Sequence, residues 1–160
     1  MDLYEELARI VDALNEAGID YAVCGGMAVA MHGHARMTKD IDLLVRKEDV
    51  ERIHGLVRPL GFDLPVAPLP FDVGTEKERL VVRVSKMVGR ELLSLDLLVV
   101  TPVFEEVWAQ RMAVKWRGKP TFLISRDGLA IMKRLAGRLQ DLADLENLGL
   151  LHDIEGSEDG

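Results

Sequence analysis

The stretch Tyr21-Ala22-Val23-Cys24-Gly25-Gly26, followed by Asp40-Ile41-Asp42-Leu43, decides the fold and the chemistry that we expect. The first run is apolar and ends in two glycines, and the second carries two carboxylates separated by one apolar residue. On a strand, Asp40 and Asp42 point to the same face, where two neighbouring carboxylates usually need a cation. The glycines allow close approach to phosphate, and the amides at the start of a helix favour anions. The stretch therefore predicts a site for phosphate and a divalent metal ion.

Length and composition predict one compact domain. The chain has 160 residues, of which 48% are hydrophobic, so it can bury a core. We expect a single domain over 1–150 and a disordered acidic tail over 151–160. The net charge of −7 means that the surface as a whole does not attract nucleic acid, although a local basic patch could.

The cysteine content and the lack of a long apolar segment indicate the compartment. Cys24 is the only cysteine, which excludes an intramolecular disulfide and fits a reducing environment. It lies in an apolar run, so a buried, inert thiol is expected. The sequence has no apolar segment of membrane-spanning length, and its N-terminus is acidic and amphipathic, unlike a signal peptide. We therefore expect a soluble cytoplasmic protein.

The hydrophobic periodicity predicts an α/β fold, with a small mixed β-sheet and helices packed mainly on one face. Glycines and a serine mark helix ends, with Gly18 and Gly61 as C-terminal caps and Ser125 as an N-terminal cap. Three prolines and a glycine predict a loop over 63–75, which could act as a flap. The expected helices are 2–17, 27–31, 47–60, 103–109, 126–136 and 139–148, and the expected strands are 20–24, 40–45, 79–87, 91–100, 112–116 and 120–124.

A third carboxylate, Asp96, lies in the middle of the strand expected over 91–100. Central strands disfavour aspartate, so its presence needs a reason. Taken alone, it could end a strand or pair with a nearby arginine or lysine. If its strand neighbours the one with Asp40 and Asp42, the three could hold two divalent ions around a transferred phosphoryl or nucleotidyl group.

The glycine pair, the spacer and the run Asp40-Ile41-Asp42-Leu43 resemble the signature of the nucleotidyltransferase superfamily that includes DNA polymerase beta. The run from Arg36 to Asp42 is similar, more narrowly, to the AbiEii-type toxin nucleotidyltransferases and their small stand-alone relatives. That branch also carries a lysine on a late helix, followed by an arginine and spaced aspartates. The matching residues are Lys133, Arg138, Asp141 and Asp144, so the resemblance runs from about residue 21 to residue 148.

The resemblance implies a role for each matching residue. Asp40 and Asp42 would bind both metal ions, Mg²⁺ or Mn²⁺, and Asp96 would bind the catalytic ion and act as, or near, the base for the attacking hydroxyl. A nucleoside triphosphate would be the substrate. Its phosphates would be contacted by the Gly25 and Gly26 amides and neutralised by cationic side chains. The expected catalytic residues are Asp40, Asp42, Asp96 and Lys133, and the expected nucleotide-binding residues are Gly25, Gly26, Arg36, Thr38, Lys39 and Lys133.

Several of these residues also have plain structural interpretations. Arg36 and Lys39 could belong to a solvated basic loop, and Lys133 could occupy a surface position on its helix. Asp141 and Asp144 lie on one helical face, where they could ligate or orient groups or simply hold Arg138. His32 and His34 are expected to be ordinary loop histidines, because the site already has hard oxygen ligands.

Three functions fit this pattern. The first is a metal-dependent nucleotidyltransferase that moves a nucleoside monophosphate to a hydroxyl on RNA (tRNA included), a protein or a small molecule. The second is a non-catalytic nucleotide-binding protein, such as the antitoxin or regulatory half of a two-gene module. The third is a phosphohydrolase that uses water as acceptor. The larger toxin enzymes carry further C-terminal helices for the acceptor, so here a partner protein or a homodimer is expected to help.

Overall fold

The computed structural model describes residues 2–34 and 38–136. The predictions for Arg36, for Arg138, for the helix over 139–148 with its two aspartates, and for the acidic tail lie outside these residues.

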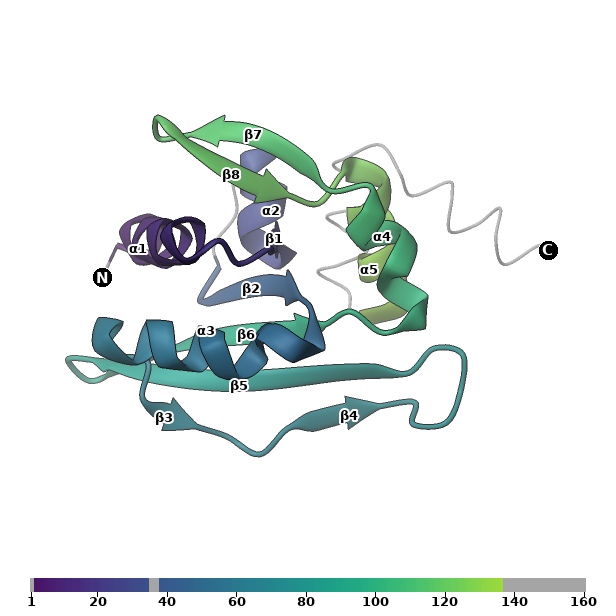
Figure 1. Ribbon diagram of the computed structural model, residues 1–160, viewed down its shortest axis with the longest axis horizontal. Coiled ribbons are helices and arrows are strands. Elements are labelled where there is room, and N and C mark those ends of the chain that lie inside the picture. The colour runs from purple at the N-terminus through teal and green to yellow at the C-terminus, as the bar shows by residue number, and fades with distance from the viewer. Residues whose placement is uncertain (1, 35–37, 137–160) are drawn as a thin grey trace.

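A mixed β-sheet forms the centre of the molecule (Figure 1). Its strand order is β3-β5-β6-β2-β1-β8-β7, and β4 also pairs with β5. β2 runs parallel to β6 and β1 parallel to β8, whereas the other neighbouring pairs are antiparallel. The predicted α/β fold with a mixed sheet is therefore confirmed. The strands are β1 (Ala22–Cys24), β2 (Asp40–Val45), β3 (Leu64–Pro65), β4 (Leu69–Phe71), β5 (Arg79–Val88), β6 (Glu91–Val99), β7 (Met112–Trp116) and β8 (Lys119–Leu123).

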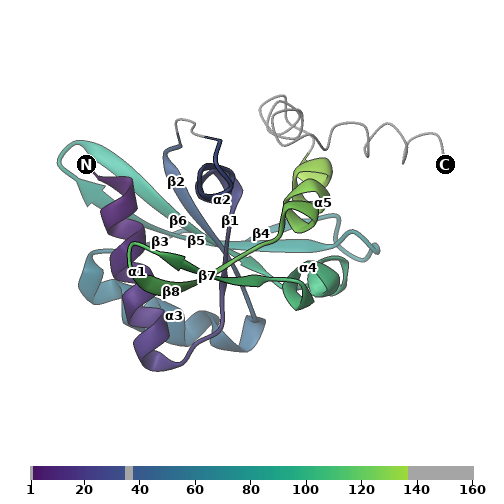
Figure 2. The same cartoon turned by 90° about the horizontal axis from the view of Figure 1, so that it is seen from above.

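Two helices, α1 (Leu3–Ala17) and α3 (Val50–Val57), cover one face of the sheet (Figure 2). The Asp2 side chain caps α1 by accepting the N–H groups of Tyr4 and Glu5, and Gly18 ends it in the left-handed conformation, as predicted. The buried faces of the two helices join the strand residues that point toward them in one core. It includes Leu7, Ile10, Leu14, Ile41, Leu43, Ile53, Val57, Leu95 and Leu97.

The other helices lie beside the aspartate-bearing face of the sheet. The short helix α2 (Gly25–Met31) follows β1 directly, and α5 (Arg126–Ala136) lies near it (Figure 2). The Ser125 hydroxyl accepts the N–H of Gly128, which confirms the predicted cap of α5. The helix α4 (Glu105–Ala109) packs against α5. Among the described residues, no helix has the length and apolar character needed to cross a membrane.

Two predicted elements differ from the structure. The segment 63–75 is not only a loop, because β3 and β4 lie within it and pair with β5. Its prolines favoured a loop, yet proline is tolerated on an edge strand, where no outer neighbour needs its missing N–H. The predicted helix over 47–60 is α only over Val50–Val57, between two 3₁₀ turns. Pro59 has no N–H to donate to the carbonyl of Gly55, which explains why the α-helical hydrogen bonding of α3 ends early.

Candidate active site

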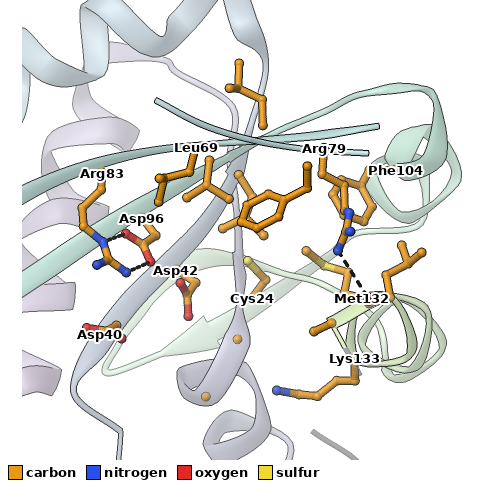
Figure 3. Close-up of a pocket in the computed structure, with 18 of the residues that line it drawn as sticks. Cys24, Asp40, Asp42, Leu69, Arg79, Arg83, Asp96, Phe104, Met132 and Lys133 are labelled. Carbon is orange, nitrogen blue, oxygen red and sulfur yellow. Dashed lines mark hydrogen bonds and ion pairs between the residues drawn. The ribbon is translucent and has the colours of Figure 1, made fainter. Parts of the chain in front are cut away.

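A pocket of about 440 Å³ opens on the face of the sheet opposite α1 and α3 (Figure 3). Its walls come from the β1–α2 junction, strands β2, β4, β5 and β6, and helix α5. Segments that are far apart in the sequence therefore meet here. The pocket is the place where the residues singled out from the sequence are brought together.

All three predicted aspartates line this pocket. Asp40 and Asp42 are alternate residues of β2, so their side chains share a face. In the parallel pairing of β2 with β6, Asp42 lies directly opposite Asp96, and Figure 3 shows the two carboxylates next to each other. Asp96 is only 8% exposed. The expectation that Asp96 lies on a strand beside Asp40 and Asp42 is thus confirmed, while the chemical roles of the three remain predictions.

Arg83 holds Asp96 in a two-pronged ion pair that the sequence analysis did not anticipate. Its Nε donates to Oδ1 at 2.7 Å, and its Nη2 donates to Oδ2 at 3.0 Å. These hydrogen bonds, and the nearby negative charge, raise the pKa of Arg83 above its ordinary value. The contact between Arg83 and Asp96 could have been predicted from the sequence, because the hairpin turn at residues 89–90 places Arg83 directly opposite Asp96 in the antiparallel pair.

Gly25 is needed where β1 passes into α2. Its φ is +64°, a conformation that L side chains rarely adopt. A Cβ atom built there would overlap the Asp42 carboxylate and lie 2.8 Å from its Cγ. The missing side chain therefore lets the Asp42 carboxylate lie directly against the backbone at the start of α2. The predicted contact of the Gly25 and Gly26 amides with phosphate stays a prediction.

Cys24 also lines the pocket, but it is not suited to act as a nucleophile. Burial raises the pKa of its thiol well above the ordinary value, and the charge of Asp42 raises it further. Lys133 opposes this effect without cancelling it. The side chain therefore stays a neutral thiol near pH 7, as expected from its apolar sequence context.

The remaining predicted residues divide into those that reach the pocket and those that do not. Lys133 is 5% exposed and lines the pocket from α5, so it is not a surface position. Thr38 also lines the pocket, and its hydroxyl donates to the Asp40 carbonyl at 3.2 Å. Lys39 is exposed and lies outside the lining. His32 makes a 2.9 Å contact from Nε2 to the Ile124 carbonyl, which fits a structural role.

The donor atoms of the site fit a hard divalent cation. Carboxylate oxygens are the protein ligands that Mg²⁺ prefers, and the Cys24 sulfur is held as a neutral thiol. Within residues 2–34 and 38–136, however, no three histidine, cysteine, aspartate or glutamate side chains are gathered closely enough to hold a metal ion. Asp96 is instead engaged by Arg83. The metal site therefore stays a prediction.

The sequence matches a known protein family. Residues 1–132 match the family described as "Uncharacterised nucleotidyltransferase". The chain belongs to this nucleotidyltransferase family. The superfamily inferred from the glycine pair and the paired aspartates is thereby confirmed, whereas the narrower AbiEii-type branch is not specifically shown. No curated protein matches this nucleotidyltransferase at a significant level.

Solved structures of nucleotidyltransferases share the fold. The lincosamide antibiotic adenylyltransferase LnuA, with lincomycin bound, is 16% identical and has a TM-score of 0.59, over 92% of this chain and 96% of its own. A putative nucleotidyltransferase from Thermotoga maritima is 13% identical with a TM-score of 0.55, over 98% and 90% of the two chains. The antibiotic-resistance factor ANT(2'')-Ia is 15% identical with a TM-score of 0.58, over 99% and 88%. At these identities the likeness concerns the fold of this nucleotidyltransferase alone.

Proposed function

We propose that this nucleotidyltransferase moves a nucleoside monophosphate from a nucleoside triphosphate to a hydroxyl group, with divalent metal ions bound at Asp40, Asp42 and Asp96. One observation carries the proposal. Asp42 of β2 lies directly opposite Asp96 of β6, with Asp40 two residues away on the same face of one pocket. Carboxylates that line one pocket favour cationic partners, as the ion pair of Asp96 with Arg83 illustrates, and carboxylate oxygens are ligands that Mg²⁺ prefers.

The bonds made and broken in this reaction can be assigned to residues of the pocket. The acceptor hydroxyl gives its proton to Asp96, and its oxygen bonds to the α-phosphorus while the bond from that phosphorus to the pyrophosphate oxygen breaks. Lys133 would neutralise charge on the departing pyrophosphate, and Arg36, which lies outside the described residues, is proposed for the same role from the sequence alone. When bound, the metal ions would supply electrostatic stabilisation of the attacking and leaving oxygens.

Arg83 has a specific consequence for this proposal. The guanidinium of Arg83 donates to both oxygens of the Asp96 carboxylate, so it occupies one side of the group that the acceptor hydroxyl would approach. Asp96 can accept the proton only if Arg83 shifts or shares the carboxylate. We therefore infer that the ion pair between Arg83 and Asp96 is present before the substrates bind. When the triphosphate binds, Arg83 turns toward its negative charge.

The acceptor, the partners and the setting are proposed more broadly. RNA (including tRNA), a protein and a small molecule all carry suitable hydroxyl groups. Of the proteins with a similar fold, one is named as a lincosamide antibiotic adenylyltransferase and another was solved in complex with adenylyl-2''-tobramycin, so small molecules belong among the acceptors to be tested. A homodimer, a role in a toxin–antitoxin module and a cytoplasmic location remain proposals from the sequence.

The decisive experiment supplies the protein with Mg²⁺ or Mn²⁺, each of four α-labelled nucleoside triphosphates, and extracts of RNA, protein and small metabolites in turn. The expected result is label transferred to one acceptor class with release of pyrophosphate, and its loss in Asp42→Asn. The exposed Asp63 lies outside the pocket, so Asp63→Asn is the matched control and should keep activity. Label that stays in free nucleotide with every acceptor, without metal-dependent nucleotide binding, would contradict the proposal.

A further inference from the structure

The pocket has two halves of different chemistry. One half holds the three aspartates with Arg83 and Lys133. The other is walled by apolar side chains from β4, β6 and α5, among them Leu69, Phe71, Leu98, Met132 and Leu135. Figure 3 shows Phe104 and Met132 across the pocket from Asp40 and Arg83. The proposed phosphate chemistry uses the first half only, so the apolar half needs its own explanation.

The apolar half is open to solvent. Leu69 is 39% exposed and Phe71 is 43% exposed, although both are large and hydrophobic. They flank Pro70 on the short strand β4, so they share a face, and both line the pocket. Exposed apolar side chains that line a concave pocket next to polar groups are typical of ligand sites.

Arg79 joins the two walls of this half. Its Nη1 donates to the carbonyl of Leu135 in α5 at 3.2 Å, and its Nη2 donates to Asp72 at 2.7 Å. Its guanidinium carbon lies 5.3 Å from the centroid of the Phe71 ring, which holds the ring beside the pocket. Arg79 is thus the charged side chain of the apolar half, and its donors are already engaged by the protein.

The charges of the described lining residues also restrict the ligand. The negatively charged lining residues are Asp40, Asp42 and Asp96, and the positively charged ones are Arg79, Arg83 and Lys133. All three carboxylates belong to the half that also holds Arg83 and Lys133. The apolar half therefore offers no negative group to a cationic ligand and suits a flat, uncharged group instead.

We propose that the apolar half binds the nucleobase of the triphosphate by stacking and apolar contact, with little discrimination between bases. This inference rests on the proposed function, because it takes the phosphates to lie at the aspartates and Lys133. Lys133 and Met132 both line the pocket from α5, so a nucleoside attached to phosphates at Lys133 can reach the apolar half. Stacking tolerates every base, whereas discrimination needs hydrogen bonds to base edges. The described side chains of this half provide only Arg79 for such bonds.

The test measures binding without turnover. The affinities of ATP, CTP, GTP, UTP and inorganic tripolyphosphate, each with Mg²⁺, are determined by calorimetry for the wild type, Phe71→Ala and Met87→Ala. Met87 is 53% exposed on β5 and lies outside the pocket, so it is the matched control. In the wild type, the four nucleotides should bind within about ten-fold of one another. Phe71→Ala should weaken each by about ten-fold, leaving tripolyphosphate unchanged. Met87→Ala should change none.

Several results would overturn the inference. These are nucleotide affinities that Phe71→Ala leaves intact, an equal loss for tripolyphosphate, a wild-type preference above a hundred-fold for one base, and nucleotides that bind no better than tripolyphosphate. An effect of Phe71→Ala on the KM of the acceptor alone would assign this half to the acceptor instead. An inactive wild type with Phe71-dependent nucleotide binding would reject the proposed reaction but keep this inference. An active enzyme whose nucleotide binding does not depend on Phe71 would keep the proposed reaction and reject this inference.

Discussion

At Gly25, the space for a side chain is already filled by the Asp42 carboxylate. Gly25→Ala should therefore lower the free energy of unfolding in two ways, through backbone strain and through displacement of Asp42. Gly18 is the matched control, because its φ of +68° is nearly the same while nothing lies within 4 Å of its Cβ position. Gly18→Ala should cost about 1–2 kcal/mol, the strain alone. Urea unfolding should show a larger loss for Gly25→Ala, together with loss of transfer activity. Equal losses would mean that Asp42 moves aside freely.

The thiol of Cys24 should react slowly in the folded protein at pH 8, because burial and the charge of Asp42 raise its pKa. The folded state then holds its proton more tightly than the unfolded state. The stability that this thiol contributes is complete below the unfolded-state pKa and is lost as the pH rises from there toward the raised folded-state pKa. Alkylation by a small thiol reagent should be far faster in urea than in buffer. Comparable rates would show that Cys24 is accessible.

At the residue scale, the site residues that could be predicted from the sequence are those recognised by their spacing or by their immediate neighbours. Asp40, Asp42 and Gly25 could be found because their spacing within a few residues has a direct chemical meaning. Asp96 stood out because a carboxylate is unusual inside an apolar strand. Arg83 was missed because an arginine on a half-exposed strand is ordinary, and only the register of the hairpin shows that it faces Asp96.

At the scale of elements, the pairing of β5 with β6 places the Arg83–Asp96 ion pair inside the pocket. Replacing Arg83 by Gln should leave a nearly buried carboxylate without its cation. The free energy of unfolding should fall by about 1–3 kcal/mol, less than for a fully buried pair, because the Arg83 side chain is 36% exposed. Asp96 would then be available to a metal ion, so Mn²⁺ should raise the melting temperature of Arg83→Gln more than that of the wild type.

Arg46 offers a matched control for this prediction. Its side chain is also 36% exposed and pairs with Glu105 at 2.9 Å, but Glu105 is 55% exposed and lies outside the pocket. Arg46→Gln should cost no more than about 1 kcal/mol and leave the response to Mn²⁺ unchanged. If both variants respond to Mn²⁺ as the wild type does, Arg83 does not compete with a metal ion for Asp96.

The helices and the long hairpin were predictable as elements, whereas β3 and β4 were not. The periodicity of 2–17 and the two β-rich runs around residues 88–90 specify their elements locally. The strands β3 and β4 are short, contain proline and depend on pairing with β5. Their place in the sheet is decided by a tertiary contact that local sequence does not encode. The apolar half of the pocket was missed for the same reason, since β4 forms one of its walls.

For the whole molecule, the strongest prediction is that a divalent ion and a triphosphate stabilise the fold jointly. Each ligand that binds only the folded state raises stability by mass action, and the phosphates complete the coordination of the ion. At a hundred-fold excess over the dissociation constant, the melting temperature should rise by about 5–10 °C, more than with Mg²⁺ or the triphosphate alone.

Asp42→Asn tests whether this joint effect arises at the pocket. The substitution preserves the shape of the side chain and removes one of three gathered charges, so the metal-free protein should be as stable as the wild type or slightly more stable. The joint rise in melting temperature should disappear. The control Asp63→Asn changes an exposed aspartate in the same way and should keep the full rise. If Asp42→Asn keeps the joint rise, or unfolds the metal-free protein, the carboxylates serve the fold and not a metal ion.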